Sequence, residues 1–255
     1  MGSTAQRQLL DALEAQCAGG QSIPLSAFMQ QVLSHPEYGY YAQNTAIGAE
    51  GDFITAPEIS PLFGEIIGAF LTYVWALSGK PDAGNALYFE AGPGRGSLLA
   101  DIMRVFSHHD CALKDSQLTL LETSQKLQTQ LRTHLVATVD DRDISRQLQV
   151  ISRPDNLPEM PIFGVANEFF DALGVDQAIL TDTGWYWHEV FCTAPSSFHL
   201  APARPLTADE IASHDLPSDA SIGTIIERSS MAESVTTILA AHIARYGGGL
   251  VIADY

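Results

Sequence analysis

The stretch YFEAGPGRGSLLADIMRVF, residues 88–106, joins a short apolar run to an amphipathic one through the glycine-rich turn GPGRG at 92–96. This order predicts a buried strand, a tight turn and a helix. Glycine loses more conformational freedom on folding than any other residue, so three glycines in five positions indicate a backbone that turns sharply or approaches a ligand closely. We interpret the turn as part of a ligand site at a helix N-terminus.

Strand and helix signals alternate around this turn. Apolar runs that predict strands occur at 86–91, 118–122, 148–151, 162–167 and 250–254, and helical patterns separate most of them. Strands that alternate with helices form right-handed crossovers and a mainly parallel sheet covered on both faces. The predicted fold class is therefore α/β.

The remaining segments do not follow this rhythm. Residues 1–84 are predicted to form a helical cover with a long loop, and the nearly all-round apolar helix at 59–79 is expected to be buried. Residues 85–255 form the α/β core, with an insertion at about 177–229. We predict that the insertion lies on the sheet as a β-hairpin around Thr183-Gly184, a loop over 193–206 and a strand within 223–230.

Composition excludes several kinds of partner. The chain of 255 residues has 13 Lys and Arg against 30 Asp and Glu, a net charge of −17, which argues against nucleic acid. The sequence shows neither a targeting signal nor an apolar stretch long enough for a bilayer, so we expect a cytoplasmic protein without a membrane partner. Three cysteines and eight scattered histidines show no metal-ligand spacing, so no metal is expected. The oligomeric state is open.

The glycine turn differs from a dinucleotide-binding fingerprint. Ser97 stands where G-x-G-x-x-G requires its third glycine. The run E-x-G-x-G-x-G that begins at Glu90 resembles the first motif of class I methyltransferases that use S-adenosylmethionine (SAM). This ligand has an adenosine and an amino-acid tail in place of a pyrophosphate. SAM is therefore favoured, and a dinucleotide-dependent oxidoreductase is the alternative.

An acidic residue follows the next predicted strand. Glu122 ends the run LTLLE, at the edge of the sheet where a nucleoside needs a carboxylate for its ribose hydroxyls. The alternative is an acid in the first turn of a helix, where it complements the helix dipole. Because a glycine turn of this kind precedes Glu122 in the sequence, the ribose role is favoured.

A second group of polar residues follows the fourth predicted strand, in GVANEFFDALGV. Asn167, Glu168 and Asp171 would line the ligand crevice together with two phenylalanines. A guanidinium is a natural guest for Glu168, because carboxylates bind it in a bidentate manner. The alternative is that the polar residues cap a helix and the phenylalanines are core. Asp254 and Tyr255 hold an analogous position after the fifth strand.

Several motifs together resemble one family. GDFITAPEIS, EAGPGRGSLLADIMR, LLETSQKLQTQ, ANEFFDAL and GGGLVIADY occur in this order, and the resemblance covers nearly the whole chain from about residue 22. Together they are similar to the MidA-like family of SAM-dependent methyltransferases. Its mitochondrial members are protein arginine methyltransferases that assist the assembly of respiratory complex I.

The resemblance implies a class I, Rossmann-like core and a set of site residues. It implies methyl transfer from SAM to a guanidinium nitrogen of a protein, or a non-catalytic SAM-binding assembly factor. The residues that would bind the cofactor are Glu90, Gly92, Gly94, Gly96, Glu122, Asp52, Thr55 and Glu58, of which Asp52, Thr55 and Glu58 belong to a segment that closes over it. The residues that would face the methyl group and its acceptor are Asn167, Glu168 and Asp171, with Glu227 as a weaker candidate.

Two positions depart from the family pattern. Gly174 follows FDAL where the family usually has proline, a local change that should leave the site intact. The sequence ends at Tyr255, whereas a class I methyltransferase sheet has two more strands after the fifth. We therefore expect a parallel sheet without its two C-terminal strands.

Overall fold

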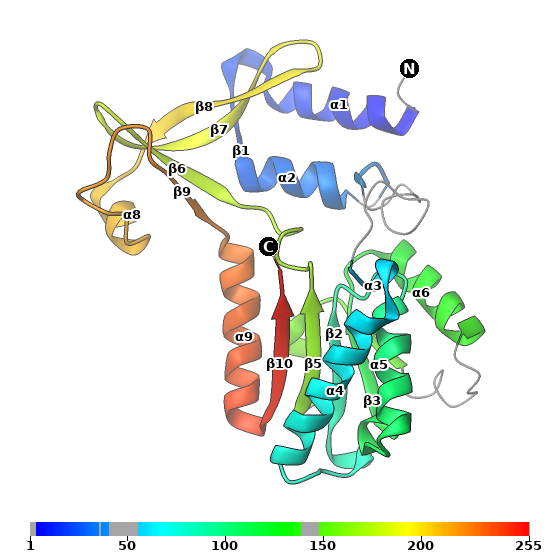
Figure 1. The fold of residues 1–255 in the computed structure, drawn as a ribbon. Helices are drawn as coiled ribbons and strands as arrows, with labels where there is room; N and C mark the ends of the chain where they lie inside the picture. Colours follow the sequence, from blue (N-terminus) through cyan, green and yellow to red (C-terminus); the bar gives the residue numbers. More distant parts are fainter. Residues whose placement is uncertain (1–3, 36, 41–55, 139–147, 255) are drawn as a thin grey trace. The chain divides into compact units, whose positions relative to one another are not determined.

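The computed structural model describes residues 4–35, 37–40, 56–138 and 148–254. The chain forms two compact units, one of Met1–Tyr40 with Leu173–Glu233 and one of Tyr41–Ala172 with Ser234–Tyr255 (Figure 1). The predicted insertion at 177–229 lies within the first unit. Residues 56–84 group with the parallel sheet, whereas the sequence predicts a domain boundary after residue 84.

The second unit is built on a parallel sheet of five strands, as the sequence predicted. The strand order is β10-β5-β2-β3-β4, and every neighbouring pair is parallel. Figure 1 labels β10, β5, β2 and β3 of this sheet. The strands are β2 (Leu87–Ala91), β3 (Gln117–Leu121), β4 (Leu148–Ile151), β5 (Ile162–Asn167) and β10 (Gly248–Ala253). The apolar runs thus became parallel strands, and β2, β3 and β5 are buried along most of their length, as is typical of strands that are apolar on both faces.

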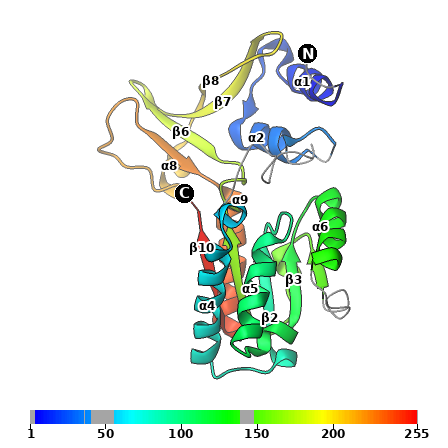
Figure 2. The ribbon, with the colours of Figure 1, turned by 45° about the vertical axis from the view of Figure 1, so that its right-hand side comes forward.

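Helices cover both faces of this sheet. On β2, Tyr88 faces a core cluster that includes residues of α4 (Pro61–Leu77), α5 (Ser97–His108) and α6 (Gln125–Thr138). Leu87 and Phe89 point the other way, into a cluster with α9 (Ser230–Tyr246). Figure 2 shows α4 and α5 in front of the strands and α9 behind them. Shorter helical segments are α3 (Ala56–Ile59), η3 (Ala83–Asn85), η4 (Ala112–Asp115) and η5 (Pro154–Asn156).

Helix α4 is not buried on all sides, so that prediction was wrong. Ile67, Leu71 and Trp75 point into the core, and Gly64 and Gly68 lie so close to α5 that a Cβ would clash there. The opposite side is an exposed apolar stripe of residues that are each more than half exposed: Leu62, Ile66, Phe70, Tyr73 and Leu77. An all-round apolar pattern does not say how many neighbours a helix will have. In the described part of the chain, no helix combines the length and apolarity that a membrane crossing requires.

The first unit contains an antiparallel sheet of its own. Its order is β1-β7-β6-β9, and β8 pairs with β7. The strands are β1 (Ile23–Pro24), β6 (Asp176–Thr181), β7 (Gly184–Ala194), β8 (Ser197–Pro205) and β9 (Ile225–Arg228), accompanied by α1 (Thr4–Gln16), η1 (Ala18–Gly20), α2 (Leu25–Ser34) and α8 (Ala208–Ser213). The predicted hairpin is β6–β7, and the predicted strand within 223–230 is β9.

One expectation about the insertion was wrong. The segment 193–206 is not a loop, because Ser197–Pro205 forms β8 and pairs along β7 from Tyr186 to Ala194. Its prolines at 202 and 205 suggested a loop, yet proline is tolerated on an edge strand. Strand β6 pairs with both β7 and β9 in an antiparallel sheet within the first unit.

Candidate functional site

The candidate site begins where the strand order reverses in the parallel sheet. Strand β2 pairs with β3 on one side and with β5 on the other. The chain leaves β2 through the glycine turn, and the loops after β3 and β5 leave the same edge. Ligands of open α/β sheets bind in the crevice at such a reversal point, outside the carboxyl ends of the strands.

The glycine turn adopts a backbone that other residues avoid. Gly92, Gly94 and Gly96 have φ values of 65°, 53° and 85°, all in the left-handed region that glycine occupies freely. Gly96 is the N-cap of α5, and its main-chain N–H donates to the carbonyl of Pro93 at 2.8 Å. The three glycines therefore make a compact turn that ends at the N-terminus of α5, as predicted.

Below the turn lies a buried acid, Glu90, which is 2% exposed. The hydroxyl of Tyr88, also buried, donates to Glu90 Oε2 at 2.8 Å. Burial raises the pKa of Glu90 to about 8, although the hydrogen bond from Tyr88 acts in the opposite direction. Burial and the neighbouring Glu90 raise the pKa of Tyr88 well above its ordinary value. A carboxyl in this environment favours its protonated form unless a cation approaches it.

Glu122 follows β3 at the same edge of the sheet. Its main-chain N–H donates to the carbonyl of Ile151 at 2.9 Å, and its Oε1 accepts from the N–H of Ser124 at 2.8 Å. Burial raises the pKa of Glu122, and the N–H groups of Ser124 and Thr123 oppose that rise. The carboxylate thus lies just before α6, where both the ribose role and the helix-terminus role place it.

The predicted closing segment is described only in part. Glu58, on α3, accepts a hydrogen bond from Ser97 Oγ at 3.0 Å, and this contact connects α3 with the first turn of α5. Asp52 and Thr55, the other two residues predicted in this segment, lie outside the described residues. The structure thus brings Glu58 next to the glycine turn through Ser97.

The residues after β5 meet the glycine turn directly. Asn167 is the last residue of β5, and Glu168 follows with φ = 47°, a left-handed conformation that costs a non-glycine residue about 1–3 kcal/mol. The ring of Phe169 packs against Gly92 so closely that a Cβ at that position would lie 3.0 Å from Phe169 Cδ2. The glycine turn and the segment after β5 therefore meet at the carboxyl edge of the sheet.

Negative charge accumulates beside this turn. Glu168 is half-buried and Asp171 is exposed. Burial raises the pKa of Glu168, and the nearby carboxylates of Asp171 and Asp254 raise it further. Such a group of carboxylates is suited to a cationic guest. Glu227, the weaker acceptor candidate, belongs to β9 in the first unit and accepts a hydrogen bond from Gln177 Nε2 at 2.8 Å.

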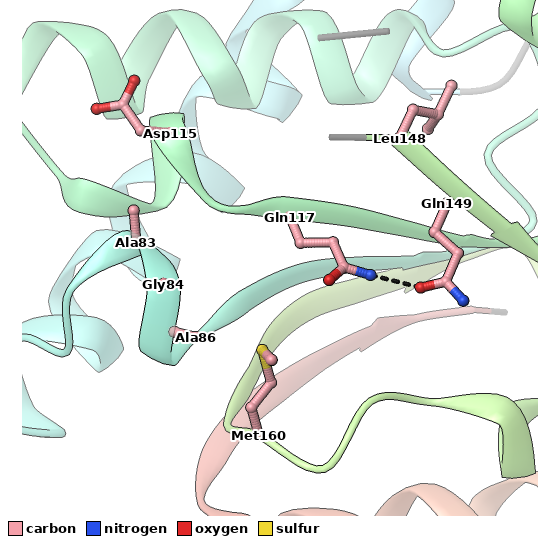
Figure 3. A pocket seen from close by; sticks show the side chains of 8 residues that line it. All are labelled: Ala83, Gly84, Ala86, Asp115, Gln117, Leu148, Gln149 and Met160. Atoms are coloured by element: carbon pink, nitrogen blue, oxygen red, sulfur yellow. Dashed lines mark hydrogen bonds between the residues drawn. The ribbon is translucent and has the colours of Figure 1, made fainter. Parts of the chain in front are cut away.

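A hollow of about 500 Å³ lies at the opposite edge of the sheet (Figure 3). Its wall comes from the amino ends of the strands, where Gln117 and Gln149 join through a side-chain hydrogen bond. The full lining is Ala83, Gly84, Ala86, Asp115, Gln117, Leu148, Gln149 and Met160. None of the predicted site residues contributes to it. Across the described residues, no group of three or more His, Cys, Asp or Glu side chains is arranged to hold a metal ion.

Comparison with known proteins shows which family the chain belongs to. Residues 66–255 match the model of a family described as "Putative S-adenosyl-L-methionine-dependent methyltransferase". The chain belongs to this family. It is also similar to "Protein arginine methyltransferase NDUFAF7, mitochondrial" of Xenopus tropicalis, with 30% identity over 99% of this chain and 62% of that protein. The rat protein of the same name is 38% identical over 91% of this chain and 56% of its own length. The chain thus spans about three fifths of these relatives.

Solved structures place the methyltransferase family on the same fold. A crystal structure of a Burkholderia thailandensis protein bound to S-adenosyl-homocysteine superimposes with a TM-score of 0.76 at 25% identity. The match covers 95% of this chain and 62% of that one. A native crystal structure from the same organism gives a TM-score of 0.73. The Rossmann-like methyltransferase fold predicted from the sequence is thereby confirmed.

Sequence reasoning missed three contacts in this candidate site. The first is the packing of Phe169 against Gly92, because Phe169 was predicted only as an aromatic wall or a core residue. The second is the hydrogen bond from Ser97 to Glu58, because Ser97 was noted only as the residue that replaces a glycine. The third contact is the hydrogen bond from the Phe170 main-chain N–H to Asp254 Oδ2 at 2.9 Å. The position of Asp254 directly after an apolar strand was the only signal for it in the sequence.

The buried acid makes a prediction for stability. Glu90 has a raised pKa in the folded chain, so unfolding releases its proton between about pH 4.5 and 8 and the free energy of unfolding falls as pH rises through this window. Glu90→Gln keeps an acceptor for Tyr88 without this proton linkage. We expect the stability of Glu90→Gln relative to wild type to increase with pH by up to about 1.4 kcal/mol per unit.

Urea unfolding of the ligand-free protein at pH 5, 6, 7 and 8 measures this effect. Glu233→Gln, a change of an exposed carboxylate on α9, is the matched control and should keep the wild-type slope. Parallel pH profiles for wild type and Glu90→Gln would show that Glu90 does not titrate in this way.

Proposed function

We propose that this chain binds SAM in the crevice at the reversal point and transfers its methyl group to a guanidinium nitrogen of a protein. The observation that carries the proposal is the contact of Phe169 with Gly92, because it joins the glycine turn to the carboxylates after β5. The family's description names the cofactor, and the relatives' printed names supply the arginine acceptor.

Each part of the crevice suits one part of SAM. The glycine turn lets the main chain approach the cofactor, since it carries no Cβ atoms at three positions. The carboxylate of Glu122 would accept hydrogen bonds from the ribose hydroxyls. Glu90 would gain a partner in the cofactor's ammonium group, which offsets the cost of ionising a buried carboxyl. Glu58 would approach from α3 through its contact with Ser97.

The carboxylates beside the glycine turn suggest how the methyl acceptor would be held. In the reaction a guanidinium nitrogen attacks the methyl carbon, the carbon–sulfur bond breaks, and its electron pair stays on sulfur as S-adenosylhomocysteine forms. The methylated nitrogen then loses one proton to a base. Asn167 and Glu168 would orient the nitrogen, and Glu168 with Asp171 would hold the guanidinium charge. The net charge of −17 favours a basic protein as substrate.

The exposed apolar stripe on α4 favours a second function. Apolar residues gathered on one exposed face are typical of surfaces that bind other proteins. In this alternative the chain binds SAM and holds another protein during assembly without transferring a methyl group. Transfer of a radiolabelled methyl group to a basic protein distinguishes the two functions.

Cofactor binding should depend on the left-handed glycines. Gly94 has φ = 53°, so Gly94→Val strains the turn and places a branched side chain where the backbone should meet the ligand. We expect at least about a tenfold loss of affinity for S-adenosylhomocysteine, measured by calorimetry, because strain of this kind costs on the order of 1–3 kcal/mol.

Gly84→Val is the control for this measurement. Nothing lies within 4 Å of a Cβ at Gly84, which belongs to the opposite edge of the sheet. Its affinity should equal that of wild type. If wild type itself binds neither SAM nor S-adenosylhomocysteine at millimolar ligand, the cofactor assignment fails.

Methyl transfer should depend on Glu168. Glu168→Gln keeps the size of the side chain and removes the charge that would hold a guanidinium. We expect transfer from tritiated SAM to an arginine-bearing basic peptide to fall by about 10²-fold, with affinity for S-adenosylhomocysteine changed less than about twofold.

Two comparisons sharpen this assay. Asp209→Asn removes an exposed carboxylate on α8 and should leave transfer unchanged. The same peptide with lysine in place of arginine should accept no label. Full activity of Glu168→Gln would contradict the role given to this carboxylate.

A further inference from the structure

Two hydrogen bonds join the turn after β5 to the end of β10. The main-chain N–H of Glu168 donates to the carbonyl of Ala253 at 2.8 Å. The main-chain N–H of Phe170 donates to the side-chain Oδ2 of Asp254 at 2.9 Å. The parallel pairing of the two strands ends at Asn167 and Ala253, so both bonds lie just past the regular ladder. Asp254 thus continues the connection between the strands where the β-ladder has stopped.

The turn that these bonds hold has an unfavourable backbone. Glu168 has φ = 47°, which a non-glycine residue adopts only when its surroundings fix it. The hydrogen bond to the Ala253 carbonyl fixes the main-chain N–H of Glu168 itself. The hydrogen bond to the Asp254 side chain fixes the main-chain N–H of Phe170, two residues later. The left-handed residue is therefore fixed at its own N–H by the last residue of β10 and, two residues later, by Asp254, which directly follows β10.

The same turn carries two groups that the crevice needs. The side chain of Glu168 is half-buried beside the other carboxylates, and the ring of Phe169 packs against Gly92. Phe169 also contacts Phe170 edge-on, with ring centroids 5.2 Å apart. A shift of the Phe170 main chain would therefore move both the acceptor carboxylate and the ring beside the glycine turn.

We propose that Asp254 is a positioning residue: its carboxylate holds the 168–170 turn so that Glu168 and Phe169 keep their places beside the glycine turn. Its importance for methyl transfer rests on the proposed function. Its importance for the geometry of the crevice does not.

Asp254 also acts on Glu168 through its charge. Together with burial and Asp171, it raises the pKa of Glu168. Asp254 therefore has two separable effects, a hydrogen bond to the turn and a negative charge near the acceptor carboxylate. Asn at this position keeps an oxygen that accepts from Phe170 and removes the charge, whereas Ala removes both.

Two variants test the proposal. For Asp254→Ala we expect at least a tenfold slower methyl transfer, a several-fold weaker affinity for S-adenosylhomocysteine, and faster hydrogen exchange of the Phe170 amide. Asp254→Asn should restore the affinity and the slow exchange. As the pH falls, Asp254→Asn should lose activity at a lower pH than wild type does, because Glu168 ionises more readily without the neighbouring charge.

The exchange measurement uses protein labelled with ¹⁵N-phenylalanine, which has 11 labelled positions. The Phe170 signal is assigned from its loss in Phe170→Leu. Asp209→Asn again serves as the control for removal of an exposed carboxylate. Exchange and affinity do not depend on the acceptor, so they test the position of the turn even if the arginine peptide is not methylated.

The outcomes separate the two ideas. The positioning role is supported if Asp254→Ala loses affinity for S-adenosylhomocysteine and slow exchange at Phe170 while Asp254→Asn recovers both. Unchanged Phe170 exchange and unchanged affinity in Asp254→Ala would overturn it. If wild type binds S-adenosylhomocysteine but methylates no peptide, and Asp254→Ala still accelerates exchange at Phe170, the proposed function fails and the positioning role stands.

Discussion

The parallel pairing of β2 with both β3 and β5 is the constraint on which the rest of the site depends. Ala91 is in register with Leu121 on one side and with Ala166 on the other. The three strands therefore end at nearly the same level, and the segments after them begin together. Gly92, Glu122 and Asn167 are far apart in the chain, yet this register places them along one edge. No loop has to be long to bring them there.

Charge gives this edge its chemical character. The segments 90–97, 122–124, 167–171 and 253–254 contribute Glu90, Glu122, Glu168, Asp171 and Asp254, against a single basic residue, Arg95. Burial raises the pKa of Glu90, Glu122 and Glu168, so ionising them without a cationic partner is costly. A ligand with a sulfonium and an ammonium group, followed by a guanidinium, would reduce that cost. The same carboxylates would therefore favour both cationic reactants.

The sequence predicted those features that depend on local patterns. The five parallel strands and the helix after GPGRG follow from apolar periodicity and from glycine, which act over a few residues. The strand β8 was missed because its prolines conceal a pairing that only β7 reveals. The contact of Phe169 with Gly92 and the hydrogen bond from Phe170 to Asp254 span 77 and 84 positions, respectively. Such contacts depend on sheet order and register, which no local pattern contains.

The small residues of helix α4 explain why one side of the helix packs on α5 and the other side is exposed. Gly64 lies over Asp101 and Gly68 over Val105, so α4 approaches α5 closely with one side. This close approach fixes the rotation of the helix, and the rotation turns Leu62, Ile66 and Phe70 outward. The apolar stripe is thus a consequence of the packing on α5 and shares no residue with the crevice. Methyl transfer and protein binding would therefore use separate surfaces, and a change on one should leave the other intact.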